Sequence, residues 1–382
     1  MKLLREETMK LENNYGRLSY TVKSNVTSVK VTQTGGHITA DFMLDGKKVN
    51  PFFVAPWWNE TCDELRGTCD YSLRGIFFGF PFGITKKTKG VERPCHGFVP
   101  ARDWDFCEET GNGTEKTLTL SISVPEEQAT VKQSVTIREG ETVLYITNSV
   151  KGAEGAYSVG YHPTLQLPEE IGSAIVDISE YDMCLTSPTH IDSPENGGYC
   201  SLLTDYQITD ETDVPTVYGQ HVNLKRQPFI KGFDDIYMYV FNDTHEFDYA
   251  VVSVPTEGYL YYQLKNPKQL SNTMIWTSYE GRHYPRWNGR VNGCIEIGAG
   301  TNYFFYGMAG EKVDNPLAQK GYHMFHEFDG SERQYKLISG VVKIPQDYQG
   351  VESIEKKDAE TIIIKGRDGS VIETACKVDF LL

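Results

Sequence analysis

The sequence lacks the features of a membrane-spanning or nucleic-acid-binding protein. It has no run of about 18 apolar residues, which excludes a transmembrane helix of ordinary length. Its 37 basic residues are outnumbered by 52 acidic ones, giving a net charge of -15. Nucleic acid and anionic membrane surfaces repel such a chain, so we expect neither as a partner.

Metal-ligand sets and targeting segments are also missing. The eight cysteines are scattered and lack zinc-ribbon spacing, so we expect free thiols and no metal site. His323 and His326 lie three residues apart, but no helix or third ligand is evident near them, which favours a surface or packing role. The first 16 residues carry charges where a signal peptide needs a continuous apolar stretch. These observations predict a cytoplasmic protein.

Sustained helical periodicity is scarce, whereas strand patterns are frequent. Leu118 to Val124 alternates apolar and polar residues, which is typical of a half-buried strand. Similar patterns predict strands over residues 38–44, 131–137, 143–147, 236–241, 250–254, 259–264, 303–306, 335–344 and 362–365. Strands separated by turn-rich pieces, without alternating helices, predict an all-β protein that forms a large antiparallel β-sandwich. We expect residues 1–382 to form one domain.

Some stretches do not follow this pattern. Residues 51–83 are dense in aromatics and glycine, which predicts a loop packed on the core by its own rings. Residues 280–290, which include Trp287, are expected to form a loop at the cleft rim. Residues 191–216 predict a long surface excursion, and residues 351–382 a hairpin that completes a sheet.

The segment Pro94 to Trp104 concentrates residue types that suit a hydroxylated substrate. His96 can move a proton near neutral pH, Arg102 can donate a pair of hydrogen bonds to oxygens, and Trp104 can stack on the apolar face of a sugar. The alternative is that His96 is a turn or core histidine and that Trp104 belongs to the core.

Two later motifs add a histidine and a carboxylate. His162 lies in Gly-Tyr-His-Pro, and Glu296 lies between Ile295 and Ile297 in Gly-Cys-Ile-Glu-Ile-Gly. Strand alternation would place both isoleucines in the core and the carboxylate on the opposite face, towards a cleft. Partial burial there would raise the pKa of Glu296 towards neutrality.

The order of these motifs resembles that of the aldose 1-epimerase (galactose mutarotase) superfamily. The matching landmarks span residues 35–310 and are Phe80-Pro81 with Gly83, His96-Gly97, Gly160 to Pro163, and the glutamate of Gly293 to Gly298. The resemblance implies a large antiparallel β-sandwich with a carbohydrate site on one concave face. It also implies an alternative for residues 51–83, in which Trp57 or Trp58 and the turn at residues 79–83 form one wall of that site. It also implies interconversion of the α and β anomers of a sugar by acid and base catalysis, without a cofactor.

The resemblance also implies roles for individual residues. Glu296 would be the base, His162 the acid at the ring oxygen, and His96 a group that polarises sugar oxygens. Either Asp234 or Asp235 would accept hydrogen bonds from sugar hydroxyls.

Arg102 is a further candidate, for hydroxyls or a phosphate. Two alternatives stay open: a binding protein without turnover, and a carbohydrate lyase or hydrolase. Hydrolysis normally needs two opposed carboxylates, for which Asp234 or Asp235 would have to join Glu296.

Overall fold

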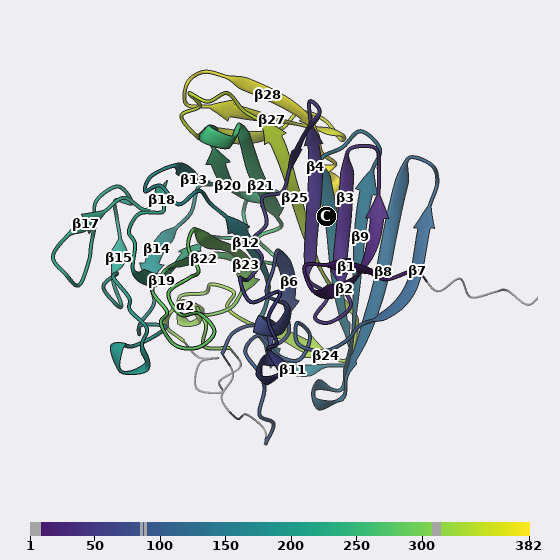
Figure 1. The fold of residues 1–382 in the computed structure, drawn as a ribbon, viewed down its shortest axis with the longest axis horizontal. Coiled ribbons are helices and arrows are strands. Elements are labelled where there is room, and N and C mark those ends of the chain that lie inside the picture. The colour runs from purple at the N-terminus through teal and green to yellow at the C-terminus, as the bar shows by residue number, and fades with distance from the viewer. Residues whose placement is uncertain (1–8, 85–86, 88–89, 308–314) are drawn as a thin grey trace, which may run out of the picture.

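The computed structural model describes residues 9–84, 87, 90–307 and 315–382 (Figure 1). Its larger sheet has 12 strands, all paired antiparallel. In spatial order they are β1 (Glu12–Asn14), β2 (Arg17–Lys23), β3 (Thr27–Thr32), β4 (Ile38–Leu44), β6 (Ile76–Gly79), β12 (Val159–Gln166), β23 (Cys294–Thr301), β22 (Asn272–Tyr279), β19 (Phe233–Val240), β14 (Met183–Thr186) and β15 (Gln207–Ile208), with β5 (Lys47–Val49) paired to β4.

A second antiparallel sheet of nine strands packs against the first. In spatial order its strands are β18 (Arg226–Gln227), β13 (Ala174–Ile178), β20 (Asp248–Val254), β21 (Tyr259–Lys265), β25 (Arg333–Lys343), β10 (Val143–Lys151), β9 (Ala129–Arg138), β8 (Glu115–Val124) and β7 (Asp105–Gly111). The predicted all-β antiparallel sandwich is therefore confirmed.

The remaining elements are short. They are the pairs β11 (Glu154–Tyr157) with β24 (His326–Asp329) and β16 (Val214–Pro215) with β17 (His221–Val222), the sheet of β26 (Val351–Lys356), β27 (Thr361–Gly366) and β28 (Val371–Ala375), the helix α2 (Pro316–Gln319), and the 3-10 turns η1 (Asp63–Leu65), η2 (Cys69–Ser72), η3 (Pro125–Glu127), η4 (Pro194–Asn196), η5 (Pro255–Glu257) and η6 (Val378–Leu381).

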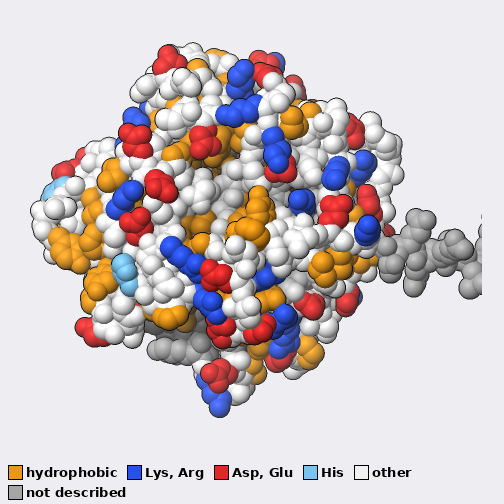
Figure 2. Space-filling view, in the orientation of Figure 1, with side chains coloured by type: hydrophobic (Ala, Val, Ile, Leu, Met, Phe, Trp, Pro, Cys, Tyr) orange, Lys and Arg blue, Asp and Glu red, His pale blue; other side chains and the backbone are white. Residues whose placement is uncertain are grey.

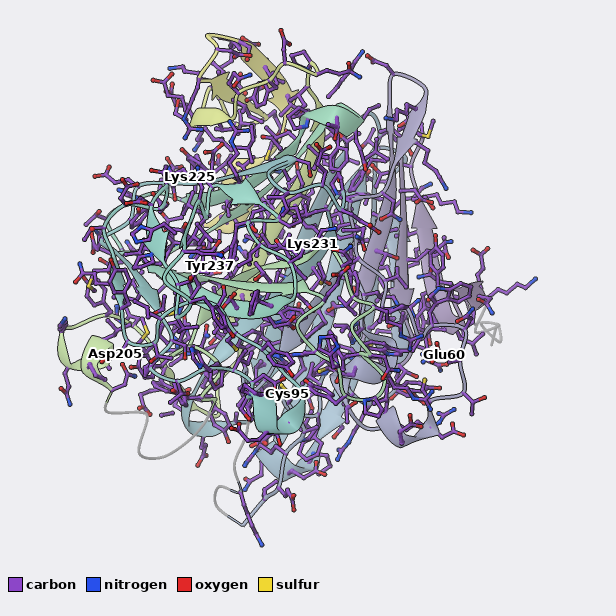
Figure 3. All side chains as sticks on the ribbon, turned by 60° about the vertical axis from the view of Figure 1, so that its left-hand side comes forward. Glu60, Cys95, Asp205, Lys225, Lys231 and Tyr237 are labelled. Atoms are coloured by element: carbon purple, nitrogen blue, oxygen red, sulfur yellow. The ribbon has the colours of Figure 1, made fainter. Side chains whose placement is uncertain are left out.

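Period-two alternation explains how the central strands of each large sheet come to be buried on both faces. On β10, Leu144 and Ile146 point into the core between the two large sheets, whereas Val143 and Tyr145 point away from it. Tyr237 of β19 belongs to the same central core and lies inside the molecule in Figure 3. Each large apolar side chain removed from water here contributes about 1.5–3 kcal/mol.

Two further cores cover the outer faces of the sheets. One lies on the 12-stranded sheet, where residues from 53–73, 82, 303–304 and 317–324 pack over β19, β22 and β23. The other lies between the nine-stranded sheet and the C-terminal residues from Tyr348 onwards. The first of these cores surrounds the cavity described below.

The structure corrects two strand predictions. Residues 303–306 form a turn, because β23 ends at Thr301 and Phe304 has a positive φ of 48°. The C-terminal residues do form the predicted hairpin, β27 with β28, but it completes neither large sheet. With β26 it forms a three-stranded sheet of its own, yellow at the top of Figure 1.

The excursion over residues 191–216 is only partly on the surface, since Ser201 and Leu202 are buried. His326 packs beside Tyr335 and hydrogen-bonds through Nε2 with the carbonyl oxygen of Gln269, so the predicted packing role is confirmed. All eight cysteines are free.

No helix in the described part of the chain is long and apolar enough to cross a membrane. On the face drawn in Figure 2, acidic and basic side chains are interspersed, without a broad patch of one sign.

The C-terminal sheet should contribute to the stability of the whole fold. Ile364 of β27 is fully buried in the core beneath that sheet. We expect Ile364→Ala to lower the free energy of unfolding by about 2–5 kcal/mol, the usual cost of such a truncation. Val371→Ala, on the adjacent strand at a side chain that is 60% exposed, should cost little. Equal urea midpoints for the two variants would show that this sheet lies outside the cooperative core.

Candidate functional site

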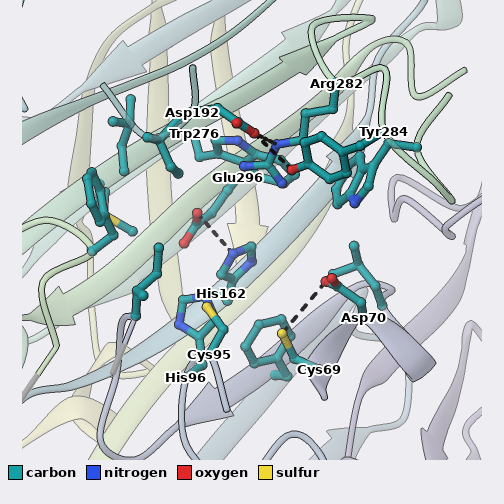
Figure 4. A pocket seen from close by; sticks show the side chains of 18 residues that line it. Cys69, Asp70, Cys95, His96, His162, Asp192, Trp276, Arg282, Tyr284 and Glu296 are labelled. Carbon is teal, nitrogen blue, oxygen red and sulfur yellow. Dashed lines mark hydrogen bonds and ion pairs between the residues drawn. The ribbon is translucent and has the colours of Figure 1, made fainter. Parts of the chain in front are cut away.

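A cavity of about 290 Å³ lies on the outer face of the 12-stranded sheet. Side chains from its central strands form the floor: Phe77 of β6, His162 of β12, Ile236 of β19, Met274 and Trp276 of β22, and Glu296 of β23. Loops supply the walls: Cys69 and Asp70 with Leu73, Ile84, Cys95 with His96, Ile191 with Asp192, Arg282 with Tyr284 and Trp287, and Phe305. Figure 4 shows these side chains around the cavity.

Glu296 reaches the cavity because of its position on β23. Ile295 and Ile297 are fully buried in the core between the sheets, and the carboxylate between them points to the other face, as the alternation predicts. A Cβ atom at Gly298 would lie 2.5 Å from Glu296 Oε1. Glycine at position 298 therefore leaves room for the carboxylate.

Glu296 is in direct contact with His162. Glu296 Oε2 lies 3.1 Å from His162 Nε2, and the two side chains are 1% and 7% exposed (Figure 4). The His162 ring stacks on Phe77, with ring centroids 4.5 Å apart. The strand register brings these groups together, since β12 lies between β6 and β23 and His162 is the partner of Phe77. The structure therefore pairs a carboxyl group with an imidazole on adjacent strands.

Burial disfavours the charged form of both groups. It raises the pKa of Glu296 well above its usual value. It lowers the pKa of His162 well below its usual value, and the neighbouring His96 lowers it further. The favoured form of the pair is therefore neutral overall, with a single proton shared between the carboxyl group and the imidazole.

His96 lies beside this pair. Its ring centroid is 5.0 Å from that of His162, in an edge-on arrangement. His96 Nδ1 accepts a hydrogen bond of 3.2 Å from the backbone N–H of Gly83, which leaves Nε2 as the N–H donor of a neutral ring. The backbone turns sharply here, with positive φ at His96 and Gly97, and a Cβ atom at Gly97 would collide with the Phe80 carbonyl group. The His-Gly pair is thus explained by the turn.

Arg282 lies on a different wall of the cavity, formed by the loop after β22. Its Nε lies 3.0 Å from Asp234 Oδ2 and 3.5 Å from Asp192 Oδ2. Its guanidinium group lies over the rings of Trp287 and Trp276. The predicted rim loop therefore does border the cavity, through Arg282 and Trp287.

Solved structures with the same architecture are known. A galactose mutarotase-like protein from Clostridium acetobutylicum matches with a TM-score of 0.60 and 13% sequence identity, over 88% of this chain and 98% of that one. A galactose mutarotase related enzyme from Lactobacillus acidophilus matches with a TM-score of 0.53 and 13% identity, over 86% and 98% of the two chains. This chain has the galactose mutarotase-like fold.

No protein-family model and no curated protein matches the sequence. At 13% identity the structural matches show the fold alone.

Asp234 and Asp235 lie on β19 of this galactose mutarotase-like fold, and neither side chain lines the cavity. Asp234 Oδ1 accepts hydrogen bonds from Ser278 Oγ and from the N–H of Gly281, while Oδ2 holds Arg282. Burial raises the pKa of Asp234 to about 6, although Arg282 opposes the shift.

Asp235 accepts hydrogen bonds from the backbone N–H groups of Ser201 and Leu202 and from Ser201 Oγ. Instead of one aspartate facing the cavity, as expected, both anchor loops.

Arg102 and Trp104 also differ from the expectation, because neither lines the cavity. Arg102 is half-exposed and forms a paired contact with Glu126 at 2.6 and 3.0 Å. Trp104 is buried in the core between the large sheets, and its Nε1 donates to the carbonyl oxygen of Val99. The core alternative for Trp104 was therefore the right one, and the chain has turned away from the cavity by residue 98.

The two predicted cleft tryptophans lie next to each other, but only Trp287 lines the cavity. Trp57 is buried behind it, with ring centroids 5.1 Å apart in an edge-on contact. Trp57 Nε1 donates to the carbonyl oxygen of Asp70 at 2.8 Å, so Trp57 supports the wall.

Sequence reasoning missed several lining residues, namely Cys69, Asp70, Cys95 and Asp192. They lie in loops without periodicity. Among the described residues, no group of three or more histidine, cysteine, aspartate or glutamate side chains is arranged to hold a metal ion.

The lowered pKa of His162 has a direct spectroscopic consequence. We expect its ring to remain neutral at pH 6, where an ordinary histidine with a pKa near 6.5 is mostly protonated. Long-range proton–nitrogen NMR spectra of the labelled protein distinguish the neutral ring from the cation, and His162→Gln assigns the signal by its loss. A cationic pattern for His162 at pH 6 to 7 would contradict the neutral pair.

Proposed function

We propose that this protein is an aldose 1-epimerase, which interconverts the α and β anomers of a sugar by opening and reclosing its ring. The observation that carries the proposal is the 3.1 Å contact between Glu296 and His162 at the floor of the cavity. The galactose mutarotase-like fold supports it as an analogy.

The reaction needs an acid and a base close together. The base removes the proton from the anomeric hydroxyl group while the acid protonates the ring oxygen, and the bond between the ring oxygen and the anomeric carbon breaks. The aldehyde then rotates and the ring closes on its other face. Because both oxygens are bonded to the same carbon, the acid and the base must lie side by side, as Glu296 and His162 do.

We assign Glu296 as the base and His162 as the acid of ring opening. The proton that the pair shares can start on either group, and ring closure reverses both roles, so each group has to donate and accept within one turnover. Because burial raises the pKa of the carboxyl group, Glu296 can also hold a proton, and because burial lowers the pKa of the imidazole, His162 can also release one, as the reversal of roles requires.

The rest of the cavity suits one sugar unit. Its volume of about 290 Å³ lies near the lower end of the range for small-ligand sites, roughly 300–1,000 Å³. Trp276 and Trp287 add apolar surface to the lining for the carbon side of a sugar ring, and His96 offers an N–H donor for an oxygen beside the acid–base pair. The proposed partner is therefore a monosaccharide or the end of a larger glycan.

A hydrolase that uses the predicted aspartates receives no support from the geometry. Asp234 forms an ion pair with Arg282, and Asp235 accepts hydrogen bonds from the backbone of Ser201 and Leu202. Neither is placed opposite Glu296 across the cavity, as the two-carboxylate mechanism requires.

Substitution of either member of the pair should reduce turnover more than binding. Glu296→Gln keeps the shape and removes the proton acceptor, and we expect anomer exchange to slow by about 10² or more. His162→Gln should have a comparable effect. The measurement is exchange NMR on freshly dissolved aldoses, with sugar binding followed in parallel by ligand-observed NMR.

His221→Gln provides the control, because this exposed side chain lies outside the cavity and should leave exchange unchanged. Full activity in Glu296→Gln would refute the assigned base. Sugar binding by the wild type without acceleration of any aldose would establish a binding protein instead of an enzyme.

A further inference from the structure

Asp70 belongs to the cavity but has no part in the acid–base chemistry above. It lies in η2, and its backbone is fixed because its carbonyl oxygen accepts hydrogen bonds from Trp57 Nε1 and from the N–H of Leu73. Figure 4 shows its carboxylate directed into the cavity from the side opposite Glu296. The fold thus fixes the backbone of Asp70.

The carboxylate of Asp70 has unused capacity to accept hydrogen bonds. Among the described residues, its hydrogen-bond donor is the thiol of Cys69, at 3.8 Å from Oδ1, and a thiol is a weak donor. The neighbouring Asp192, by contrast, accepts from Tyr284 and Ser193 and is close to Arg282. A carboxylate has about four acceptor sites and gives up strong hydrogen bonds with water when it is enclosed. Asp70, which is half-buried, therefore has acceptor sites left for a ligand, and among the lining carboxylates only Oε1 of Glu296 shares this property.

A ligand that complements Asp70 must bring hydrogen-bond donors without negative charge. Neighbouring hydroxyl groups of a sugar meet this requirement, since the two oxygens of one carboxylate can accept from both. Glu296 and His162 occupy the other side of the cavity, so the hydroxyls that reach Asp70 are those remote from the anomeric carbon.

We propose that Asp70 binds hydroxyl groups at the non-anomeric end of the sugar and thereby determines which aldose the cavity accepts. This inference rests on the proposed function for the reaction, but its binding component can be tested without turnover. A site built to bind a hydroxyl group rejects an analogue that lacks it, because the buried partner is then left unpaired. Asp70 thus discriminates between sugars that differ at the position it contacts.

The test compares Asp70→Asn with the wild type on an accepted aldohexose and its 2-, 3-, 4- and 6-deoxy analogues. Asparagine keeps the size of the side chain and the backbone contacts, but it removes the charge and one acceptor oxygen. We expect kcat/KM to fall about 10- to 100-fold on the parent sugar, mainly through KM. On the one or two analogues that lack the contacted hydroxyl, wild type and variant should be nearly equal.

Asp63→Asn is the matched control, because Asp63 is an exposed carboxylate of η1 paired with Arg66. An equal loss on every analogue would show that Asp70 only supports the fold and would overturn the proposal. Release of the leaving group from aryl glycosides by the wild type but not by Asp70→Asn would also overturn it, by making Asp70 a catalytic carboxylate.

If no aldose is accelerated, the epimerase proposal fails, and ligand-observed NMR on the same sugars then decides the role of Asp70. The hydroxyl contact is supported if Asp70→Asn binds the parent sugar more weakly than the wild type does. In that case the two proteins should bind the deoxy analogue that lacks the contacted hydroxyl with equal affinity. The same weakening for every sugar refutes it.

Discussion

The contact between the buried carboxyl group of Glu296 and the buried imidazole of His162 is the interaction on which the cavity depends. Neither group could carry an isolated charge at this depth without a large loss of hydration. Sharing one proton lets both remain in a dry environment, where burial raises the pKa of the carboxyl group and lowers that of the imidazole. A wetter site would return both groups to their ordinary pKa values and would let the pair carry charge.

Two consecutive aspartates keep the surrounding loops in place. On β19, Asp234 holds Arg282 on one loop, and Asp235 holds the backbone of Ser201 and Leu202 on another. Both aspartates are buried in a sheet that is covered on its two faces, so their own positions are rigid. The side chains of the cavity walls are thereby held in fixed positions relative to the strands of the floor. An acid–base mechanism requires such fixed positions.

The strands could be predicted from the sequence because side chains alternate regularly between their two faces. Alternating residues located most of the large strands and placed Glu296 on the opposite face of β23 from Ile295 and Ile297. His162 was assigned a role through the resemblance of its motif to a known family, and His96 was first noticed for the residue types around it; both histidines line the cavity.

Proximity in sequence was a poor guide elsewhere. Arg102 and Trp104 follow His96 closely, but the positive φ angles of His96 and Gly97 redirect the chain, and Trp104 then enters the central core. Asp70 and Cys69 could not be found because a short 3-10 turn in an aromatic loop has no periodicity. Their place in the cavity is set by Trp57 and its neighbours, contacts that exist only in the folded chain.

The aromatic cluster also links the cavity to the tryptophan fluorescence of the protein. The sequence has five tryptophans, and three of them are in contact here: Trp57 with Trp287 at 5.1 Å and Trp276 with Trp287 at 5.9 Å between ring centroids. The guanidinium group of Arg282 lies over the latter two rings, so their emission depends on a charge beside the ligand site. Trp104, in the central core, and the half-exposed Trp58 lie outside the cavity and supply a steady background. The intrinsic fluorescence of the unlabelled protein thus becomes a gauge of whether the cavity is occupied.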